Sequence, residues 1–158
     1  MELSEVRNRI LTTPLVQNLP EEMRNKFAMQ LLWIANTEEV SREQKLFVQG
    51  DKDSDYGCLI LEGMVRIITE ESNKKTIDAP DILGEVQLFT PQGERTATVE
   101  VVVGGEILTF SWKEFGAAAK VNFTDEQMDT LKKVIAESAW TRQENLLEKI
   151  KEKQSAES

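Results

Sequence analysis

The sequence predicts a mainly β domain with flanking helices: an antiparallel β jelly roll, or double-stranded β-helix, with N-terminal helices before it and a long C-terminal helix after it. Two observations support this fold class. Between Thr37 and Trp112 the apolar residues form short runs separated by turn residues, which is typical of antiparallel all-β domains. On both sides of this segment the apolar residues recur at intervals of three and four, which is typical of helices.

Two helices are expected before the strands. Residues 3–11 carry apolar side chains at helical spacing. The second helix is expected to begin at Pro20, because proline suits the first helical position and Glu21 and Glu22 interact favourably with the helix dipole. Its apolar side chains should pack against a sheet, and they are Met23, Phe27, Leu31 and Ile34.

Seven strands are expected in the central segment. Turns are predicted at Gly50-Asp51, Glu62-Gly63, residues 71–73 and Gly104-Gly105, because these residue types favour tight turns. Such short and evenly spaced strands are typical of a jelly roll. The expected strands are residues 37–40, 46–48, 58–61, 65–69, 75–78, 96–103 and 107–111.

Two further helices are expected after the strands. The first covers residues 113–119, and the second begins at Thr124 and ends near Lys151. Thr124 and Gln127 have the spacing of a capping box. The second helix has about 25 residues and is therefore about 40 Å long, which is too long for a small roll to cover. Part of its apolar stripe needs another partner, and dimerisation is preferred over folding back onto the same domain.

Residues 84–97 have the side chains of a site for a phosphate and a sugar. Gly84 and Glu85 precede a short apolar segment, and the N–H groups at the start of a helix there would point at an anion. Arg95 adds a guanidinium fork that suits phosphate oxygens. The carboxylate of Glu85 only accepts hydrogen bonds, which suits a sugar hydroxyl.

This segment resembles the phosphate-binding cassette of cyclic-nucleotide-binding domains. The resemblance extends from about Leu11 to Phe115 and includes the hairpins around Gly50 and Gly63. It is closest to the bacterial activators of the family, whose cassettes have the same spacing between glutamate and arginine. The resemblance implies that cAMP or cGMP is the ligand. It assigns the ribose to Gly84 and Glu85, and the phosphate to Arg95, Thr96, Val86 and Gln87.

Each of these residues also has a structural interpretation. Arg95 can instead be a surface residue that pairs with its neighbour, and Glu85 can simply favour the first turn of a helix. Gln87 departs from the family, which usually has a small residue at this position, so its side chain either turns away or fills part of the phosphate subsite. Thr96 is compatible with cAMP and with cGMP and does not decide the base.

The resemblance also concerns the long helix, which covers the nucleotide and forms a two-fold dimer in this family. It places Arg142 and Gln143 near the base bound by the partner chain, with a solvated helix face as the alternative. The expected organisation is residues 1–123 as helical lead-in and β-roll, residues 124–151 as the lid and dimerisation helix of the same domain, and residues 152–158 as a frayed tail.

Composition argues against several classes of protein. The net charge is −9, with 28 acidic and 19 basic residues and no basic stripe, so we expect no binding to nucleic acid. No apolar run has the length of a membrane span, and the N-terminus lacks the pattern of a secretory signal, so we expect a cytoplasmic protein that does not bind membranes. There is no histidine, and Cys58 is the single cysteine, so we expect no metal site and no catalytic residues.

The sequence therefore predicts a stand-alone regulatory domain that binds a cyclic nucleotide as its ligand, needs no cofactor and is not an enzyme. The activators that it resembles carry a DNA-binding domain after the long helix, whereas only residues 151–158 follow here. We therefore expect an unidentified effector protein as its partner and a homodimer formed through the long helix. The alternative is a degenerate roll that binds no nucleotide and serves as a dimeric protein-interaction scaffold.

Overall fold

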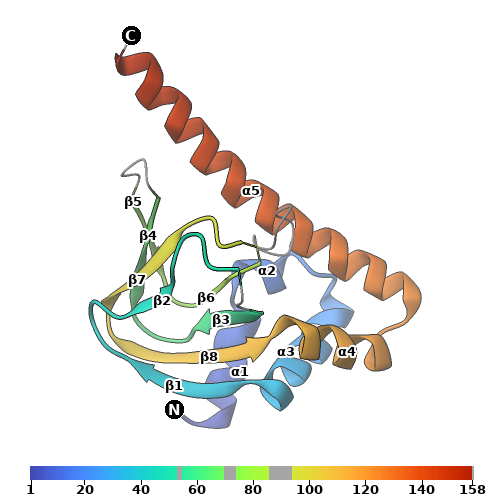
Figure 1. The fold of residues 1–158 in the computed structure, drawn as a ribbon. Coiled ribbons are helices and arrows are strands. Elements are labelled where there is room, and N and C mark those ends of the chain that lie inside the picture. The colour runs from blue at the N-terminus through green and yellow to red at the C-terminus, as the bar shows by residue number, and fades with distance from the viewer. Residues whose placement is uncertain (53–54, 70–73, 86–93, 158) are drawn as a thin grey trace.

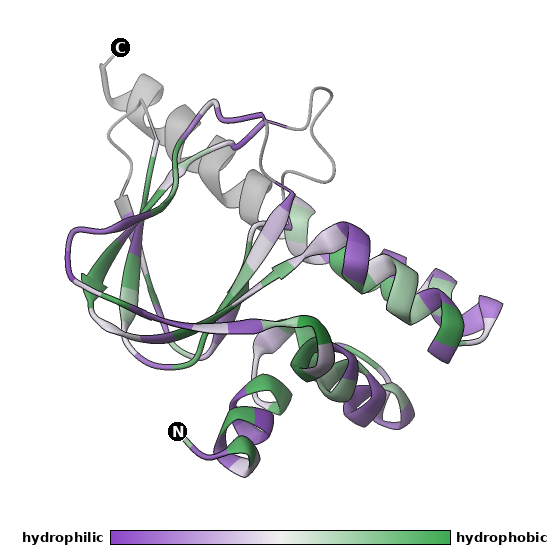
Figure 2. Cartoon of the chain, turned by 60° about the horizontal axis from the view of Figure 1, so that its bottom comes forward, coloured by the Kyte–Doolittle hydropathy of each residue, from purple (hydrophilic) through white to green (hydrophobic). Residues whose placement is uncertain are grey.

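The computed structural model describes residues 1–52, 55–69, 74–85 and 94–157, with side chains as far as Thr141. Helices flank a central set of strands (Figure 1), and Figure 2 shows the same arrangement from another side. In chain order the elements are α1 Leu3–Leu11, α2 Pro14–Gln17, α3 Glu21–Ile34, β1 Asn36–Val40, β2 Lys45–Phe47, β3 Tyr56–Ile60, β4 Met64–Ile68, β5 Lys74–Asp78, β6 Asp81–Leu83, β7 Thr98–Val103, β8 Gly105–Ser111, α4 Trp112–Asn122 and α5 Asp125–Glu157.

The strands form two four-stranded sheets. The first sheet has the order β1-β8-β3-β6 and the second has the order β2-β7-β4-β5. All observed strand pairs are antiparallel. The pairs β1–β8 and β3–β6 belong to the first sheet, and the pairs β2–β7 and β4–β5 belong to the second. This arrangement confirms the predicted jelly roll with flanking helices.

The first sheet is buried on both faces, and this gives the molecule two cores. On β3, Cys58 and Ile60 belong to the core between the two sheets. The next residues along the chain, Leu59 and Leu61, belong to a second core that the sheet shares with the helices. Successive side chains of a strand point to opposite faces, so a strand that is covered on both sides needs an uninterrupted apolar run such as residues 58–61.

Aromatic rings attach the helices to the first sheet. The ring of Phe27 on α3 lies 5.0 Å from that of Phe115 on α4, measured between centroids. Phe110 at the end of β8 contacts Trp112 at the start of α4 in an edge-on arrangement, with 4.9 Å between centroids. Such pairs stabilise the packing beyond the area that they bury, and they fix α4 relative to both α3 and the sheet.

The capping box predicted for the long helix is confirmed. The amide of Thr124 donates to Oε1 of Gln127, and the amide of Gln127 donates to Oγ1 of Thr124, both at 3.1 Å. The first half of α5 buries Leu131 and Ala139 against the other helices and the roll. Its second half extends away from the roll (Figure 1).

Two short elements and one helix end differ from the sequence-based expectation. The sequence did not indicate α2 or β6, because four and three residues are too few to show a periodic pattern. The long helix α5 continues to Glu157, beyond the end expected near Lys151. Neither glycine nor proline occurs after Thr124 to end the helix. None of the described helices has the length and apolar character needed to span a membrane.

We expect Thr124→Ala to lower the free energy of unfolding by about 1 kcal/mol, because the change removes the side-chain acceptor at the start of α5. Denaturant unfolding measures this loss. Thr130→Ala is the matched control, since its hydroxyl donates to the Glu126 carbonyl within the helix at 3.2 Å and caps nothing. Equal effects of the two changes would contradict a specific role for the capping box.

Candidate functional site

The main chain fixes the position of Arg95 before β7. Its amide donates to the Asp51 carbonyl at 2.8 Å, and its carbonyl accepts from the Gly50 amide at 2.9 Å. The predicted turn at Gly50-Asp51 thus holds the arginine against the roll. Arg95 is 4% exposed, so the alternative of a surface arginine is wrong.

The guanidinium of Arg95 lies among carbonyl groups and aromatic rings. Nη2 donates to the Tyr56 carbonyl at 2.6 Å, and Nη1 donates to the Gly84 carbonyl at 3.3 Å. The group also lies over the rings of Phe47 and Tyr56, at 4.0 and 5.2 Å from their centroids. Burial lowers the pKa of Arg95, but an arginine remains charged at any physiological pH. The site therefore contains a buried and well-oriented cation.

Gly84 meets two requirements that exclude a side chain. Its φ is +101°, which a residue with a Cβ rarely adopts. A Cβ at this position would lie 3.0 Å from Nη1 of Arg95 and 3.2 Å from the ring of Phe47. The glycine is therefore both a turn residue and the reason that the main chain can approach the guanidinium.

Glu85 connects this segment to the long helix. Its side chain is fully buried, and its Oε1 accepts a hydrogen bond from Oγ of Ser138 on α5 at 3.1 Å. Ser138 was not among the site residues predicted from the sequence. Ser138 lies one helical turn before Arg142, and residues four apart share a helix face. The predicted place of Arg142 near the ligand was therefore a signal that Ser138 also faces the site. The structure thus brings residues from the cassette segment and from α5 together.

The remaining predicted residues are placed only in part. Thr96 is half-buried in a bend before β7. Val86 and Gln87 lie outside the described residues, and so does the short apolar helix expected after Glu85. The main chain of Arg142 and Gln143 belongs to α5, but their side chains lie outside the described part.

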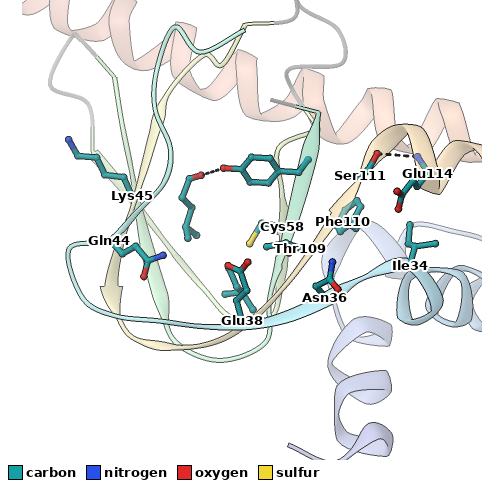
Figure 3. A pocket seen from close by; sticks show the side chains of 13 residues that line it. Ile34, Asn36, Glu38, Gln44, Lys45, Cys58, Thr109, Phe110, Ser111 and Glu114 are labelled. Atoms are coloured by element: carbon teal, nitrogen blue, oxygen red, sulfur yellow. Dashed lines mark hydrogen bonds between the residues drawn. The ribbon is translucent and has the colours of Figure 1, made fainter. Parts of the chain in front are cut away.

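A cavity of about 420 Å³ lies at another place in the roll (Figure 3). It is lined by β1, β3, β8 and the region of β2, and we call it the β1–β2 pocket. It includes none of the residues that the sequence predicted for the ligand. The Tyr56 side chain lies at its edge and donates a hydrogen bond from its hydroxyl to the Leu46 carbonyl at 2.5 Å. Tyr56 therefore contributes to both places, since it lines this pocket and also contacts Arg95 through its carbonyl and its ring.

Cys58 lines the same pocket and is buried. Burial, with a smaller contribution from Glu38, raises its pKa to about 12. The thiol is therefore protonated and unreactive at neutral pH. Among the described residues no group of three potential ligands is placed to hold a metal ion.

We expect Gly84→Ala to lower the free energy of unfolding by about 1–3 kcal/mol, because the new methyl group meets Arg95 in a left-handed conformation. Gly116→Ala is the control, since Gly116 lies within α4 and a Cβ there would meet no atom within 4 Å. In a helix this second change should stabilise the protein by up to about 1 kcal/mol. A stable Gly84→Ala protein in denaturant unfolding would contradict the close approach.

The family model of the cyclic nucleotide-binding domain matches residues 37–122. No curated protein has a sequence that matches this chain significantly. Solved structures share its fold. The sensor domain of the transcriptional regulator DNR from Pseudomonas aeruginosa is 17% identical, with a TM-score of 0.63 over 86% of this chain and 91% of that chain.

Two further structures give similar values. A cyclic nucleotide-binding domain from Methylobacillus flagellatus is 18% identical, with a TM-score of 0.67 over 88% of this chain and 78% of that one. The Thermus thermophilus catabolite activator protein is 18% identical, with a TM-score of 0.64 over 88% of this chain. This chain spans 62% of that activator. The family match covers more than half of the 158 residues, and the chain therefore belongs to the cyclic nucleotide-binding domain family.

Proposed function

We propose that the chain is a regulatory domain that binds cAMP or cGMP in the segment between Gly84 and Arg95. The family implies a cyclic nucleotide as the ligand. The observation that carries the proposal is the burial of one cation and one carboxylate at the two ends of this segment. Arg95 is 4% exposed and Glu85 is fully buried. Charged side chains are rarely buried without a role for their charge.

The phosphate would be bound by Arg95. Its guanidinium already has a fixed plane, because it lies over the Phe47 ring and donates to two carbonyl groups. A phosphate oxygen is a stronger acceptor than a neutral carbonyl, so a ligand can replace one of these bonds with gain. We assign the main-chain amides of Val86 and Gln87 and the hydroxyl of Thr96 to the same phosphate. The net charge of −9 weakens phosphate binding only slightly, because surface charges are screened over about 10 Å.

The ribose would be bound by Glu85 together with the main chain at Gly84. A carboxylate accepts several hydrogen bonds, so Glu85 can accept from a ribose hydroxyl while Ser138 still donates to it. The ligand and α5 then share one carboxylate. A nucleotide that fixes Glu85 shifts the population of α5 poses, by as much as its affinities for the two poses differ.

We further propose that α5 forms a homodimer and that Arg142 and Gln143 reach the base of the nucleotide bound by the partner chain. In this proposal residues 1–123 form the sensing roll with its helical lead-in, and residues 124–151 act as its lid and dimerisation helix. The signal passes to an effector protein in the cytoplasm. We propose no enzymatic activity, which fits a chain without histidine and with a protonated cysteine.

Calorimetric titration with cAMP, cGMP and a cyclic dinucleotide tests the proposal. We expect saturable binding of one of the two mononucleotides, and an Arg95→Ala protein should bind it roughly 30–150-fold more weakly, because a charged hydrogen bond contributes about 2–3 kcal/mol. Arg42→Ala is the matched control, since this arginine is exposed and remote in the chain. Circular dichroism establishes that each variant is folded.

Unchanged affinity in the folded Arg95→Ala protein would remove this arginine from the site. Should that variant fail to fold, Glu85→Gln provides the second test. The amide accepts fewer hydrogen bonds and can donate, so it should weaken ribose binding while it keeps the shape of the side chain. Absence of binding by the wild-type chain to every member of the panel would contradict the proposal as a whole.

One observation favours the alternative of a dimeric protein-interaction scaffold that binds no nucleotide. Trp33 is 89% exposed and Met29 is 57% exposed on α3, where they line a hollow of about 420 Å³ beside α4. Exposed apolar surface of this kind favours association. Under this alternative no cyclic nucleotide raises the melting temperature, and Trp33→Ser weakens self-association in sedimentation equilibrium. Trp140→Ser, which alters the exposed tryptophan of α5, distinguishes this surface from a dimer formed by the long helix.

A further inference from the structure

The inner face of β1 carries polar residues where the fold needs none. The register of the first sheet aligns Glu38 with Ile107 of β8, and Ile107 with Ile60 of β3. Both isoleucines are 1% exposed and belong to the core between the sheets. The neighbouring row aligns Asn36 with Thr109 and then with Cys58. Glu38 and Asn36 thus lie at the β1 end of two rows of residues that run across the strands of the sheet. Both rows are apolar where they reach β3.

Asn36 and Glu38 are exposed, and the alternation of the strand places them on the inner face of the sheet. Alternate residues of a strand share a face, so Asn36 and Glu38 lie on the same face as Val40. Val40 is buried in the core between the two sheets. Glu39 lies on the opposite face, where its register partner is Glu106. The polar residues at positions 36 and 38 are therefore inner-face residues of the roll.

The second sheet leaves these two residues uncovered, and the β1–β2 pocket is the result. β2 has only three residues, Lys45–Phe47, and the space in front of β1 remains as a cavity of about 420 Å³. This volume lies within the range of small-molecule sites. Ile107, Leu46 and Cys58 give the cavity an apolar wall, and Asn36, Glu38 and Thr109 add polar groups. An apolar pocket with a few converging polar groups is the usual form of such a site.

The charges of the lining select the kind of ligand. Two carboxylates, Glu38 and Glu114, and one ammonium group, Lys45, line the cavity. In Figure 3 the Glu38 carboxylate extends into the cavity, whereas the Lys45 side chain extends away from Cys58 and the cavity centre. The influence of Glu38 on the Cys58 thiol agrees with this orientation. Arg95, which is not part of the lining, acts on the pKa of the same thiol in the opposite direction. The negative charge is therefore local to Glu38, and a positively charged group fits that side of the cavity best.

We propose that the β1–β2 pocket is a second ligand site, which binds a small organic amine with its ammonium group on Glu38 and its apolar body on Ile107 and Leu46. This site goes beyond the proposed nucleotide site, since its lining includes neither Arg95 nor Glu85, although Tyr56 and Cys58 lie near Arg95. Its ligand has the opposite charge to a cyclic nucleotide. Because Tyr56 contacts Arg95 through its carbonyl and lines this pocket with its ring, an occupant here adjoins a residue that holds the guanidinium.

Three probes with the same apolar body test the charge preference: 2-phenylethylamine, 2-phenylethanol and 3-phenylpropionate. Each is titrated into ¹⁵N-labelled full-length protein, and the amide shifts of Glu38 and Ile107 report occupancy. For so few atoms we expect a Kd on the order of 1 mM for the amine. We expect the alcohol and the carboxylate to bind at least about tenfold more weakly than the amine. A tenfold difference in Kd corresponds to about 1.4 kcal/mol.

Glu38→Gln and Glu39→Gln form a matched pair, because they change neighbouring carboxylates on opposite faces of one strand. Glu38→Gln should weaken amine binding about tenfold, whereas Glu39→Gln should leave the Kd within about a factor of two. Equal binding of the three probes, equal effects of the two changes, or the absence of saturable shifts at these amides would each overturn the proposal. Adding cAMP or cGMP to the amine-saturated protein separates this site from the nucleotide site, since we expect the amine-induced shifts at Glu38 and Ile107 to persist.

Discussion

The burial of one guanidinium determines much of this structure. Arg95 lies inside the roll where Tyr56 and Gly84 offer carbonyl groups and Phe47 offers the face of its ring. These partners come from β2, β3 and the residue after β6, so a single side chain holds three segments together. The same contact explains why position 84 must be a glycine. A buried cation is costly by itself, and this cost is offset where an anion adds to its partners.

The hydrogen bond between Glu85 and Ser138 gives the site its connection to the rest of the molecule. It is a contact between the segment that would hold the ligand and the helix that extends beyond the roll. The first half of α5 is packed, with Leu131 and Ala139 buried, and its second half leaves the roll. A change at Glu85 therefore acts near the point where α5 changes from a packed helix to an extended one. A small displacement there moves the far end of a long helix by much more.

The sequence was sufficient for the elements that depend on local patterns. The bounds of α1 follow from periodicity, and the capping box of α5 follows from two side chains. Contacts between segments that are distant in the sequence could not be predicted from local patterns. Phe47 and Ser138 are ordinary strand and helix residues in the sequence, and only the fold places them beside the cassette. The short elements α2 and β6 carry too few residues for any periodic signal.

The roll is asymmetric in a way that its fold does not require. A jelly roll is stabilised by apolar side chains on the inner faces of both sheets, and Val40, Ile60 and Ile107 meet this requirement. Apolar residues at positions 36 and 38 would extend the same core toward β2 and close the cavity. Asn36 and Glu38 are instead polar and exposed, and the β1–β2 pocket lies in front of them. Where a sequence departs from the pattern that stabilises its fold, the departure is best explained by what the position binds. On this argument two different places in the roll would serve different ligands, an anion near Arg95 and a cation near Glu38.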